Sequence, residues 1–432
     1  MRRVVTTWWP LAASWMLMSL EGPALSAVIA RLPAPKINLA AYGGVVFPLA
    51  LIIESPIIML LAASTALSKD RASYQLIRRF TMIAGALLTA LHALIAFTPL
   101  YYILVEDILG VPQVIVEPAR LGLKLMLPWT WSIAYRRFNQ GALIRFGHSR
   151  TVGVGTLVRL SANLLVLAIG YWIGTLPGVA VASSAVAMGV MSEAFYVGLV
   201  VRPVRKNQVQ TAAPVEPALT WAAFYAFYIP LMMTSLLTLL ANPISSAAIS
   251  RMPLSLDSLA VMSVVLGFVF LLRSMGTAYN EVVVALLDVR GSYASLKRFA
   301  SLLILTSTGV LLLVAATPLS SYWFVGVTAL SPDLALMAQR GLWLALPLPA
   351  LTVLQSWYQG ALLHGRRTRG ITESVGVYLL TSALVLGFGV VSAEVAGLYV
   401  AVFAMTASVA TQTAWLWWRS RPVLRQIREE ES

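Results

Sequence analysis

The chain has 432 residues, of which 59% are hydrophobic and only 11% are charged. A soluble domain could not bury so much apolar surface, so the composition predicts a protein that lies in a lipid bilayer. The absence of cysteine excludes disulfides, thiolate nucleophiles and cysteine-ligated metals. A net charge of +14 would suggest a nucleic-acid partner in a soluble protein, but in a membrane protein basic residues collect in cytoplasmic loops, so we expect no nucleic acid.

Twelve apolar stretches, each of about 20 residues or more, have the length that crosses a bilayer. They lie near residues 6–30, 38–67, 80–104, 114–136, 152–174 and 177–201, and then near 218–250, 256–287, 299–324, 333–358, 371–391 and 394–418. The opening Met1-Arg2-Arg3 and its apolar run resemble a signal peptide, but the run recurs at the start of the second half, so we expect a retained helix. The sequence thus predicts an all-α, polytopic membrane protein with twelve transmembrane helices.

An internal repeat relates the two halves. The pattern of Pro23, Arg31 and Pro33 recurs 220 residues later, at 243–253. Further along, the offset becomes 219, as in the tetrapeptide Gln-Gly-Ala-Leu that begins at Gln140 and again at Gln359. A period of this size indicates a duplicated half rather than a solenoid unit.

The basic residues predict the orientation. With a cytoplasmic N-terminus, most of the 31 Lys and Arg residues fall on the cytoplasmic side of the membrane, which is their usual side. We therefore expect both termini in the cytoplasm, a location in the inner (cytoplasmic) membrane, and two parallel six-helix repeats. The predicted parts are an N-terminal lobe at 1–201, a cytoplasmic linker at 202–217, a C-terminal lobe at 218–418 and a cytoplasmic tail at 419–432.

Charged side chains inside the spans are candidates for function, because each costs about 2.5–3.5 kcal/mol on insertion scales unless it faces a polar interior. Arg120 and Lys124 share one helix face, and Glu117 could neutralise one of them. Arg340 falls one position from the repeat equivalent of Arg120, so both lobes could present basic groups to a central cavity and bind an anionic substrate. The alternative is that these groups reach the outer surface or form salt bridges within a lobe.

A second candidate is the pair Glu54 and Arg273, which the 219 offset relates and which fall near the bilayer midplane. They could form a charge pair between the lobes, for which the substrate would compete by binding Arg273. The alternative is a separate partner for each within its own lobe. Arg159 and Glu193 lie in the inner third of the membrane, where they either face the interior or reach the cytoplasmic headgroups.

Carboxylates and a histidine in the spans are candidates for coupling or gating. Glu21 has no acidic counterpart in the repeat, so this lone carboxyl is a candidate proton or cation site. His92 could instead be a satisfied structural residue. The complete coupling or gating set consists of Glu21, Glu54, His92 and Glu281.

The sequence contains no nucleophile–base cluster, metal-binding box or nucleotide loop. We therefore expect no catalytic residues, no metal site and no cofactor, and an enzyme is poorly supported. A purely structural scaffold would not retain so many intramembrane charges.

Several segments carry a resemblance to known exporters. A proline-bearing first span, Leu39-Ala40-Ala41 at the start of the second, and the loops 139–151 and 358–370 resemble the multidrug, oligosaccharidyl-lipid and polysaccharide (MOP) exporter superfamily. Within it, the chain is most similar to the progressive ankylosis family of anion exporters, through the segments 20–32, 39–43, 68–71, 92–111 and 279–288. The resemblance implies V-shaped lobes of the MATE type and the export of citrate, pyrophosphate or a nucleotide.

Together these observations predict a secondary active transporter that exports an anionic solute by alternating access between two lobes. We expect a monomer that uses H+ or Na+ as a possible coupling ion. One alternative is a cation-coupled multidrug antiporter of the MATE type, in which Glu21 would bind the coupling ion. Another is a flippase for a lipid-linked oligosaccharide, whose diphosphate would also need a basic cavity.

Overall fold

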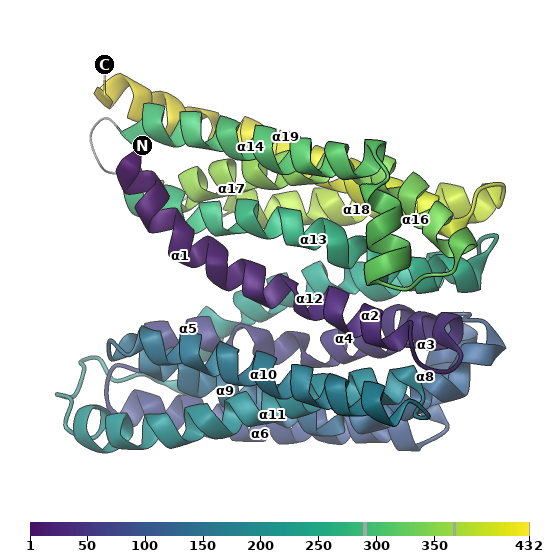
Figure 1. Ribbon diagram of the computed structural model, residues 1–432. Helices are drawn as coiled ribbons and strands as arrows, with labels where there is room; N and C mark the ends of the chain where they lie inside the picture. Colours follow the sequence, from purple (N-terminus) through teal and green to yellow (C-terminus); the bar gives the residue numbers. More distant parts are fainter. Residues whose placement is uncertain (288–291, 366–368, 432) are drawn as a thin grey trace. The chain divides into compact units, whose positions relative to one another are not determined.

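The computed structural model describes the chain except for residues 288–291, 366–368 and 432. Throughout the described residues the regular structure is helical, and no strand occurs (Figure 1). The chain divides into two compact units. The first unit comprises residues 31–246, and the second comprises residues 1–30 together with 247–432.

The first unit begins with a broken span and continues with longer helices. Its elements are α3 (Pro35–Ala41), η1 (Tyr42–Val46), α4 (Phe47–Ile58), α5 (Leu60–Leu67), α6 (Arg71–Phe97), α7 (Leu100–Tyr102), η2 (Ile103–Ile108), α8 (Gln113–Leu125), α9 (Leu127–Arg145), α10 (Ser149–Ile173), α11 (Gly178–Val204), η3 (Arg205–Val209) and most of α12 (Trp221–Ser250). The η elements are π-helices.

The second unit has a similar succession of elements. They are α1 (Arg2–Ser19), α2 (Glu21–Ile29), the end of α12, α13 (Ser255–Leu286), α14 (Ser292–Ala316), α15 (Leu319–Ser321), η4 (Tyr322–Val327), α16 (Pro332–Ala345), α17 (Leu348–His364), α18 (Arg369–Ser392) and α19 (Gly397–Glu431). The single helix α13 stands in place of α3, η1, α4 and α5.

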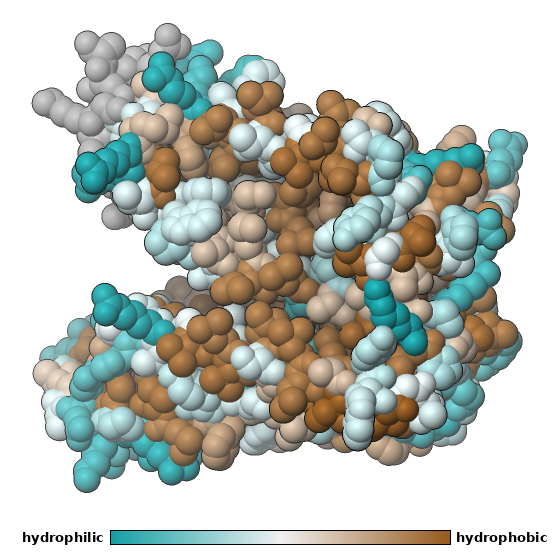
Figure 2. All heavy atoms as spheres, viewed as in Figure 1, coloured by the Kyte–Doolittle hydropathy of each residue, from teal (hydrophilic) through white to brown (hydrophobic). Residues whose placement is uncertain are grey.

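Among the described residues, eleven helical segments are long and apolar enough to cross a membrane. The predicted span that is not among these eleven is the fourth one, near 114–136, which corresponds to α8 and α9. Its repeat counterpart, Pro332–His364, is one of the eleven. Charged residues in α8 and α9 lower the hydropathy of that pair. In Figure 2, hydrophobic residues cover much of the visible surface. Large apolar side chains such as Leu87, Trp172, Leu305 and Phe388 are exposed. The architecture is that of an all-α, multi-pass membrane protein.

The structure reproduces the sequence repeat in detail. Helix α7 and the π-helix η2 recur as α15 and η4 with an offset of 219 residues. Pro99 and Pro318 take the same place, directly before α7 and α15. Ala34 and Leu254, 220 residues apart, both have positive φ angles of 50° and 53° before a helix begins.

The change of offset from 220 to 219 has a structural cause in the second span. This span has 33 residues in the first half (Pro35–Leu67) and 32 in the second half (Ser255–Leu286). The longer copy contains the π-helix η1, whereas α13 is α-helical throughout. A π-bulge lets an α-helix take up an additional residue without ending. The extra residue of the first half is therefore absorbed by η1.

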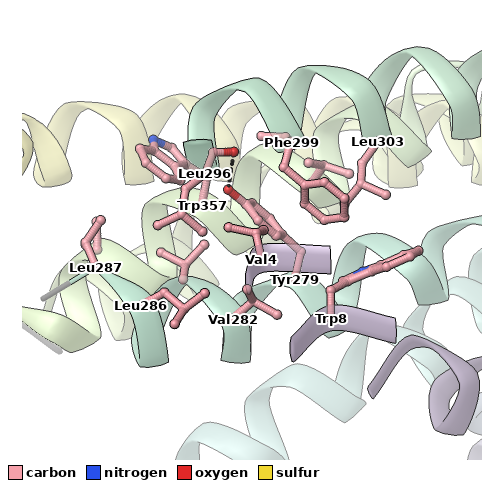
Figure 3. Packing of buried hydrophobic residues seen from close by; sticks show 14 of the residues in the cluster. Val4, Trp8, Tyr279, Val282, Leu286, Leu287, Leu296, Phe299, Leu303 and Trp357 are labelled. Atoms are coloured by element: carbon pink, nitrogen blue, oxygen red, sulfur yellow. Dashed lines mark hydrogen bonds between the residues drawn. The ribbon is translucent and has the colours of Figure 1, made fainter. Parts of the chain in front are cut away.

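The first helix of the chain packs within the second unit. Trp8 of α1 donates its indole N–H to the carbonyl of Met275 at 3.0 Å. Its ring meets Phe299 edge-on, with centroids 5.2 Å apart. Figure 3 shows Val4 and Trp8 beside Tyr279, whose hydroxyl donates to the carbonyl of Leu296 at 2.9 Å. The apolar face of α1 is thus buried against α13 and α14.

The first helix of the other half, α12, packs within the first unit. The rings of Phe224 and Tyr228 surround Phe80 of α6, with centroids 4.9 and 5.1 Å from it. The Tyr228 hydroxyl also donates to the carbonyl of Pro56. The compact units consequently differ by one helix per half from the lobes expected at 1–201 and 218–418, and those lobe boundaries stay a prediction based on the repeat.

Candidate functional site

Five charged side chains and one glutamine, from four helices, meet inside the first unit, and we name this group the buried charge cluster. Its members are Glu54 of α4, Arg136, Arg137 and Gln140 of α9, Arg159 of α10, and Glu193 of α11. Three guanidinium groups face two carboxylates, so the cluster carries one net positive charge when all are ionised.

Glu193 is the centre of the cluster and is fully buried. Arg136 Nη1 donates to Glu193 Oε2 at 2.5 Å, and Gln140 Nε2 donates to Oε1 at 2.8 Å. Arg159 Nε lies 3.8 Å from Oε2. Arg136 and Gln140 reach the same carboxylate because positions four apart lie on one helix face.

Close packing of α10 and α11 brings Arg159 to Glu193. A Cβ atom at Gly189 would lie 3.0 Å from the carbonyl oxygen of Arg159, so glycine permits this approach. Small residues are the usual means by which membrane helices come close together.

Glu54 lies beside the guanidinium groups of α9 and is only 3% exposed. The charged groups that act on it are Arg137 and, less strongly, Arg136. Among the described residues, no hydrogen-bond partner reaches Glu54 Oε2, Arg136 Nε or Arg137 Nε, although all three atoms are buried. Such atoms are rare in folded proteins and usually meet a water or an ion.

The second unit has a neutral version of the ion pair. Gln355 and Gln412 stand 219 residues after Arg136 and Glu193, and Gln355 Nε2 donates to Gln412 Oε1 at 2.7 Å. The repeat thus keeps the contact between these two helices while it replaces the charges by amides.

Arg273 takes the place of Glu54 in the second unit. Its Nε donates to the Thr352 hydroxyl at 2.8 Å, and Tyr378, the counterpart of Arg159, is within electrostatic range. Glu54 and Arg273 each have polar neighbours in their own unit, which was the alternative expected for them. The predicted charge pair between the lobes stays a prediction.

Arg120 is held by contacts within the first unit. Its Nε donates to a carbonyl of α6 at 3.1 Å, and its Nη1 donates to the Tyr102 hydroxyl at 2.6 Å. That hydroxyl donates to Glu117 Oε1 at 2.7 Å, so Glu117 is close to Arg120 as the sequence suggested. Lys124 Nζ lies 5.4 Å from the ring centroid of Phe97. These contacts lie within the first unit, and the role of Arg120 and Lys124 as substrate ligands stays a prediction.

Arg340 is exposed on α16. The residue that repeats the contact of Arg120 is its neighbour Gln339, which donates to the Ser321 hydroxyl at 2.8 Å. Ser321 in turn is the counterpart of Tyr102. The structure therefore leaves the Arg340 side chain outside this repeated contact.

His92 is fully buried between α8 and α9. Its Nε2 lies 2.9 Å from the carbonyl oxygen of Leu123, which can only accept, so Nε2 carries a hydrogen. Its Nδ1 lies 2.8 Å from the Thr130 hydroxyl, which can donate to it. A neutral imidazole satisfies both contacts.

The remaining candidates for coupling lie in the second unit. Glu21 is partly buried and begins α2, directly after the break that follows α1. Glu281 is exposed on α13. Among the described residues, no group of three or more His, Asp or Glu side chains could hold a metal ion.

The sequence analysis missed Arg136, Arg137 and Gln140 as site residues. The apolar stretch ends near 136, which placed the two arginines in a cytoplasmic segment. Helix α9 instead continues to Arg145 and carries them into the interior of the unit. The sequence around these residues has little amphipathic periodicity. The repeat does provide a signal, because Gln355, the counterpart of Arg136, is also polar.

Comparison with known proteins relates the chain to transporters by fold. No protein-family model and no curated protein sequence matches it. A multidrug resistance MATE family transporter of the MOP superfamily, in an inward-facing conformation, superposes with a TM-score of 0.76 at 13% identity, over 99% of this chain and 100% of that one. The lipid II flippase MurJ, inward closed, gives 0.68 at 12% identity, over 96% and 91%.

A MOP superfamily transporter from Pyrococcus furiosus, described by a reverse polarity of its binding pocket, gives a TM-score of 0.62 at 15% identity, over 99% of this chain and 97% of that chain. At these identities the likeness defines the fold alone. The chain has the fold of MOP superfamily transporters, which agrees with the expected superfamily; the finer likeness to the progressive ankylosis family stays a prediction.

Proposed function

We propose that this protein is a secondary active transporter that exports an anionic solute by alternating access. The observation that carries the proposal is the excess of guanidinium groups in the buried charge cluster of the first unit. The fold of MOP superfamily transporters, matched along nearly the whole chain, supports a transport function.

The buried charges favour an anion for a physical reason. Removing a guanidinium group from water is expensive unless a negative charge compensates it. Glu193 accepts from Arg136 and Gln140, and Glu54 is the carboxylate that acts most strongly on Arg137. An incoming carboxylate or phosphate would neutralise the remaining charge, and the planar guanidinium group suits both.

Citrate, pyrophosphate and nucleotides are the solutes to test first, because of the sequence resemblance to the progressive ankylosis family. We keep as part of the proposal an inner-membrane location, cytoplasmic termini, monomeric action and coupling to H+ or Na+. Arg120, Lys124, Arg273 and Arg340 are proposed as further substrate ligands, and Glu21, Glu54, His92 and Glu281 as coupling or gating groups. For Arg120 and His92, the contacts described above favour a structural role.

Two alternatives have support of their own. The likeness to a multidrug MATE transporter favours a cation-coupled antiporter, in which Glu21 would bind the coupling ion. The likeness to a lipid II flippase favours a lipid-linked diphosphate, which is also anionic.

The proposal is tested by a flux panel in proteoliposomes that contain the purified full-length chain. The panel compares radiolabelled citrate, pyrophosphate and nucleotide with a cationic dye and a lipid-linked diphosphate, with and without a pH gradient. We expect saturable flux of at least one soluble anion above that of empty liposomes. Flux of the dye alone, or of the lipid alone, would contradict the proposal and select the corresponding alternative.

A further inference from the structure

The buried charge cluster contains polar atoms that the unit's own side chains do not satisfy. Glu54 Oε2, Arg136 Nε and Arg137 Nε are buried, and no group in the described part of the chain hydrogen bonds to them. The side chains of Glu54 and Arg136 are 3% and 5% exposed. A ligand that completes the cluster must accept hydrogen bonds from the guanidinium groups and also meet a carboxyl oxygen.

Glu193 does not act as the missing acceptor in this structure. Its Oε2 accepts from Arg136 and its Oε1 accepts from Gln140, while Arg137 Nε has no hydrogen-bond partner among the described residues. Arg159 Nε lies 3.8 Å from the same carboxylate. Arg137 therefore has Glu54 as its stronger carboxylate partner and Glu193 as its weaker one, and an outside anion would add to this charge compensation.

An oxyanion beside the guanidinium groups would meet Glu54 as a neighbour of like charge. Repulsion between two such groups opposes binding while Glu54 is ionised. A proton on Glu54 removes the repulsion and adds an O–H donor, and it raises the net charge of the cluster from one to two positive charges. Binding of the anion and of the proton then favour each other by linkage.

We propose that the buried charge cluster binds the transported oxyanion together with one proton, which Glu54 carries. This inference rests on the proposed function and names the coupling residue for it.

The surroundings of Glu54 leave it as the group that can take up this proton. The charges that act on it belong to Arg137 and Arg136 of α9, and Arg137 is also influenced by Arg159 of α10 and Glu193 of α11. Helix α6, which also packs against α4, carries Arg71, Tyr74, Arg78, Arg79 and His92, and none of these is among the charges that act on Glu54. Two tyrosines lie on other elements packed against α4, Tyr42 of η1 and Tyr228 of α12. Tyrosines are neutral near pH 7, and the Tyr228 hydroxyl already donates to Pro56.

The second unit has no equivalent acid. The position of Glu54 is taken by Arg273, and those of Arg136 and Glu193 by Gln355 and Gln412. The repeat therefore assigns proton coupling at this depth to the first unit alone.

The test measures proton uptake on anion binding by the purified full-length protein in detergent and weak buffer. The probe is pyrophosphate or citrate, whichever the flux panel selects, and a pH indicator reports the protons. We expect the wild type to take up about one proton more per bound anion than Glu54→Gln. Because both proteins are measured with the same anion, protons that the anion itself takes up or releases cancel in the comparison. Glu54→Gln should still bind, because its amide keeps a donor, with an affinity that depends less on pH.

A second variant tests the guanidinium side of the site. Arg137→Ser installs the residue that stands at the counterpart position, Ser356, and should weaken anion binding by about tenfold or more. Arg145→Gln changes an exposed arginine on the same helix and should bind as the wild type does. Thermal unfolding of each variant verifies that it is folded.

Equal proton uptake by the wild type and Glu54→Gln would overturn the inference, and so would unchanged anion affinity in folded Arg137→Ser. In either case the proposed function would stand, because the wild type would still bind and transport the anion. If no anion of the panel binds or moves, the proposed function itself is wrong.

Discussion

Arg136 and Glu193 form an ion pair inside the first unit at a place where the repeat has two glutamines in contact. Both pairs connect the same two helices of the repeat, α9 to α11 and α17 to α19. A neutral pair is therefore compatible with this packing, so the charges serve a purpose other than joining the helices. Buried ion pairs are in general weak evidence for stability, since desolvation offsets much of their attraction.

This relationship makes a prediction about stability. Arg136→Gln or Glu193→Gln alone leaves an opposite charge buried without its partner and should destabilise the protein by about 3–5 kcal/mol. The double variant reproduces the pair of the second unit and should regain most of that loss. Thermal unfolding in detergent provides the measurement. A double variant no more stable than the worse single variant would show that the ion pair is needed for packing.

Arg340 offers a direct test of the predicted outer basic ligands. Its side chain is exposed, and the contact that Arg120 makes is repeated by Gln339 instead. Arg340→Ala should therefore leave unfolding temperature and expression close to wild type. If Arg340 guides the anion to its site, the KM for anion transport should be about two- to fivefold higher in Arg340→Ala than in the wild type. This difference should shrink in high salt. Gln339→Ala is the matched control; an unchanged KM for Arg340→Ala would remove Arg340 from the substrate site.

Asp70, which lies outside the membrane spans, should make the stability of the protein depend on pH. Its Oδ1 accepts from the Ser73 backbone N–H at 2.8 Å, which caps α6, and its Oδ2 accepts from the Val215 N–H at 3.0 Å. Burial alone would raise the pKa of Asp70, but hydrogen bonds from Ser73 and Val215 outweigh it and lower the pKa below its usual value of 3.8.

A lowered folded-state pKa means that this stabilisation is present above the unfolded pKa and is lost as the pH falls through the folded one. Unfolding temperatures of the wild type and Asp70→Asn should therefore differ most above about pH 4 and converge at lower pH. Ser149→Ala, at the start of α10, is a control for general acid effects. Parallel curves for the wild type and Asp70→Asn would contradict the assignment.

The orientation in the membrane is open to a labelling test, because the chain has no cysteine. Leu176→Cys, between α10 and α11, should react with an impermeant maleimide in intact cells. Arg145→Cys, at the end of α9, should react only after the cells are opened. The reverse pattern would place the termini outside the cytoplasm.

The sequence predicted the helical class, the repeat and the spans, because apolar length and matched prolines are local signals. It did not predict which residues meet. Glu54, Arg136 and Glu193 come from helices far apart in the sequence, and no periodicity connects them. Arg136 was misplaced because the hydropathy falls before α9 ends. The packing of α1 with α13 could not be predicted either, since a repeat relates the two halves without showing in which compact unit the first helix of each half packs.

The most direct measurement of the central claim is saturable anion flux in proteoliposomes, compared between the wild type and Arg137→Ser at equal incorporation. The account predicts that the wild type carries the anion chosen by the panel, and that Arg137→Ser lowers flux at subsaturating anion by about tenfold or more, because the buried cluster loses a guanidinium group. Arg145→Gln should match the wild type. Equal anion flux by wild type and folded Arg137→Ser would contradict the claim that the buried charge cluster binds the transported anion.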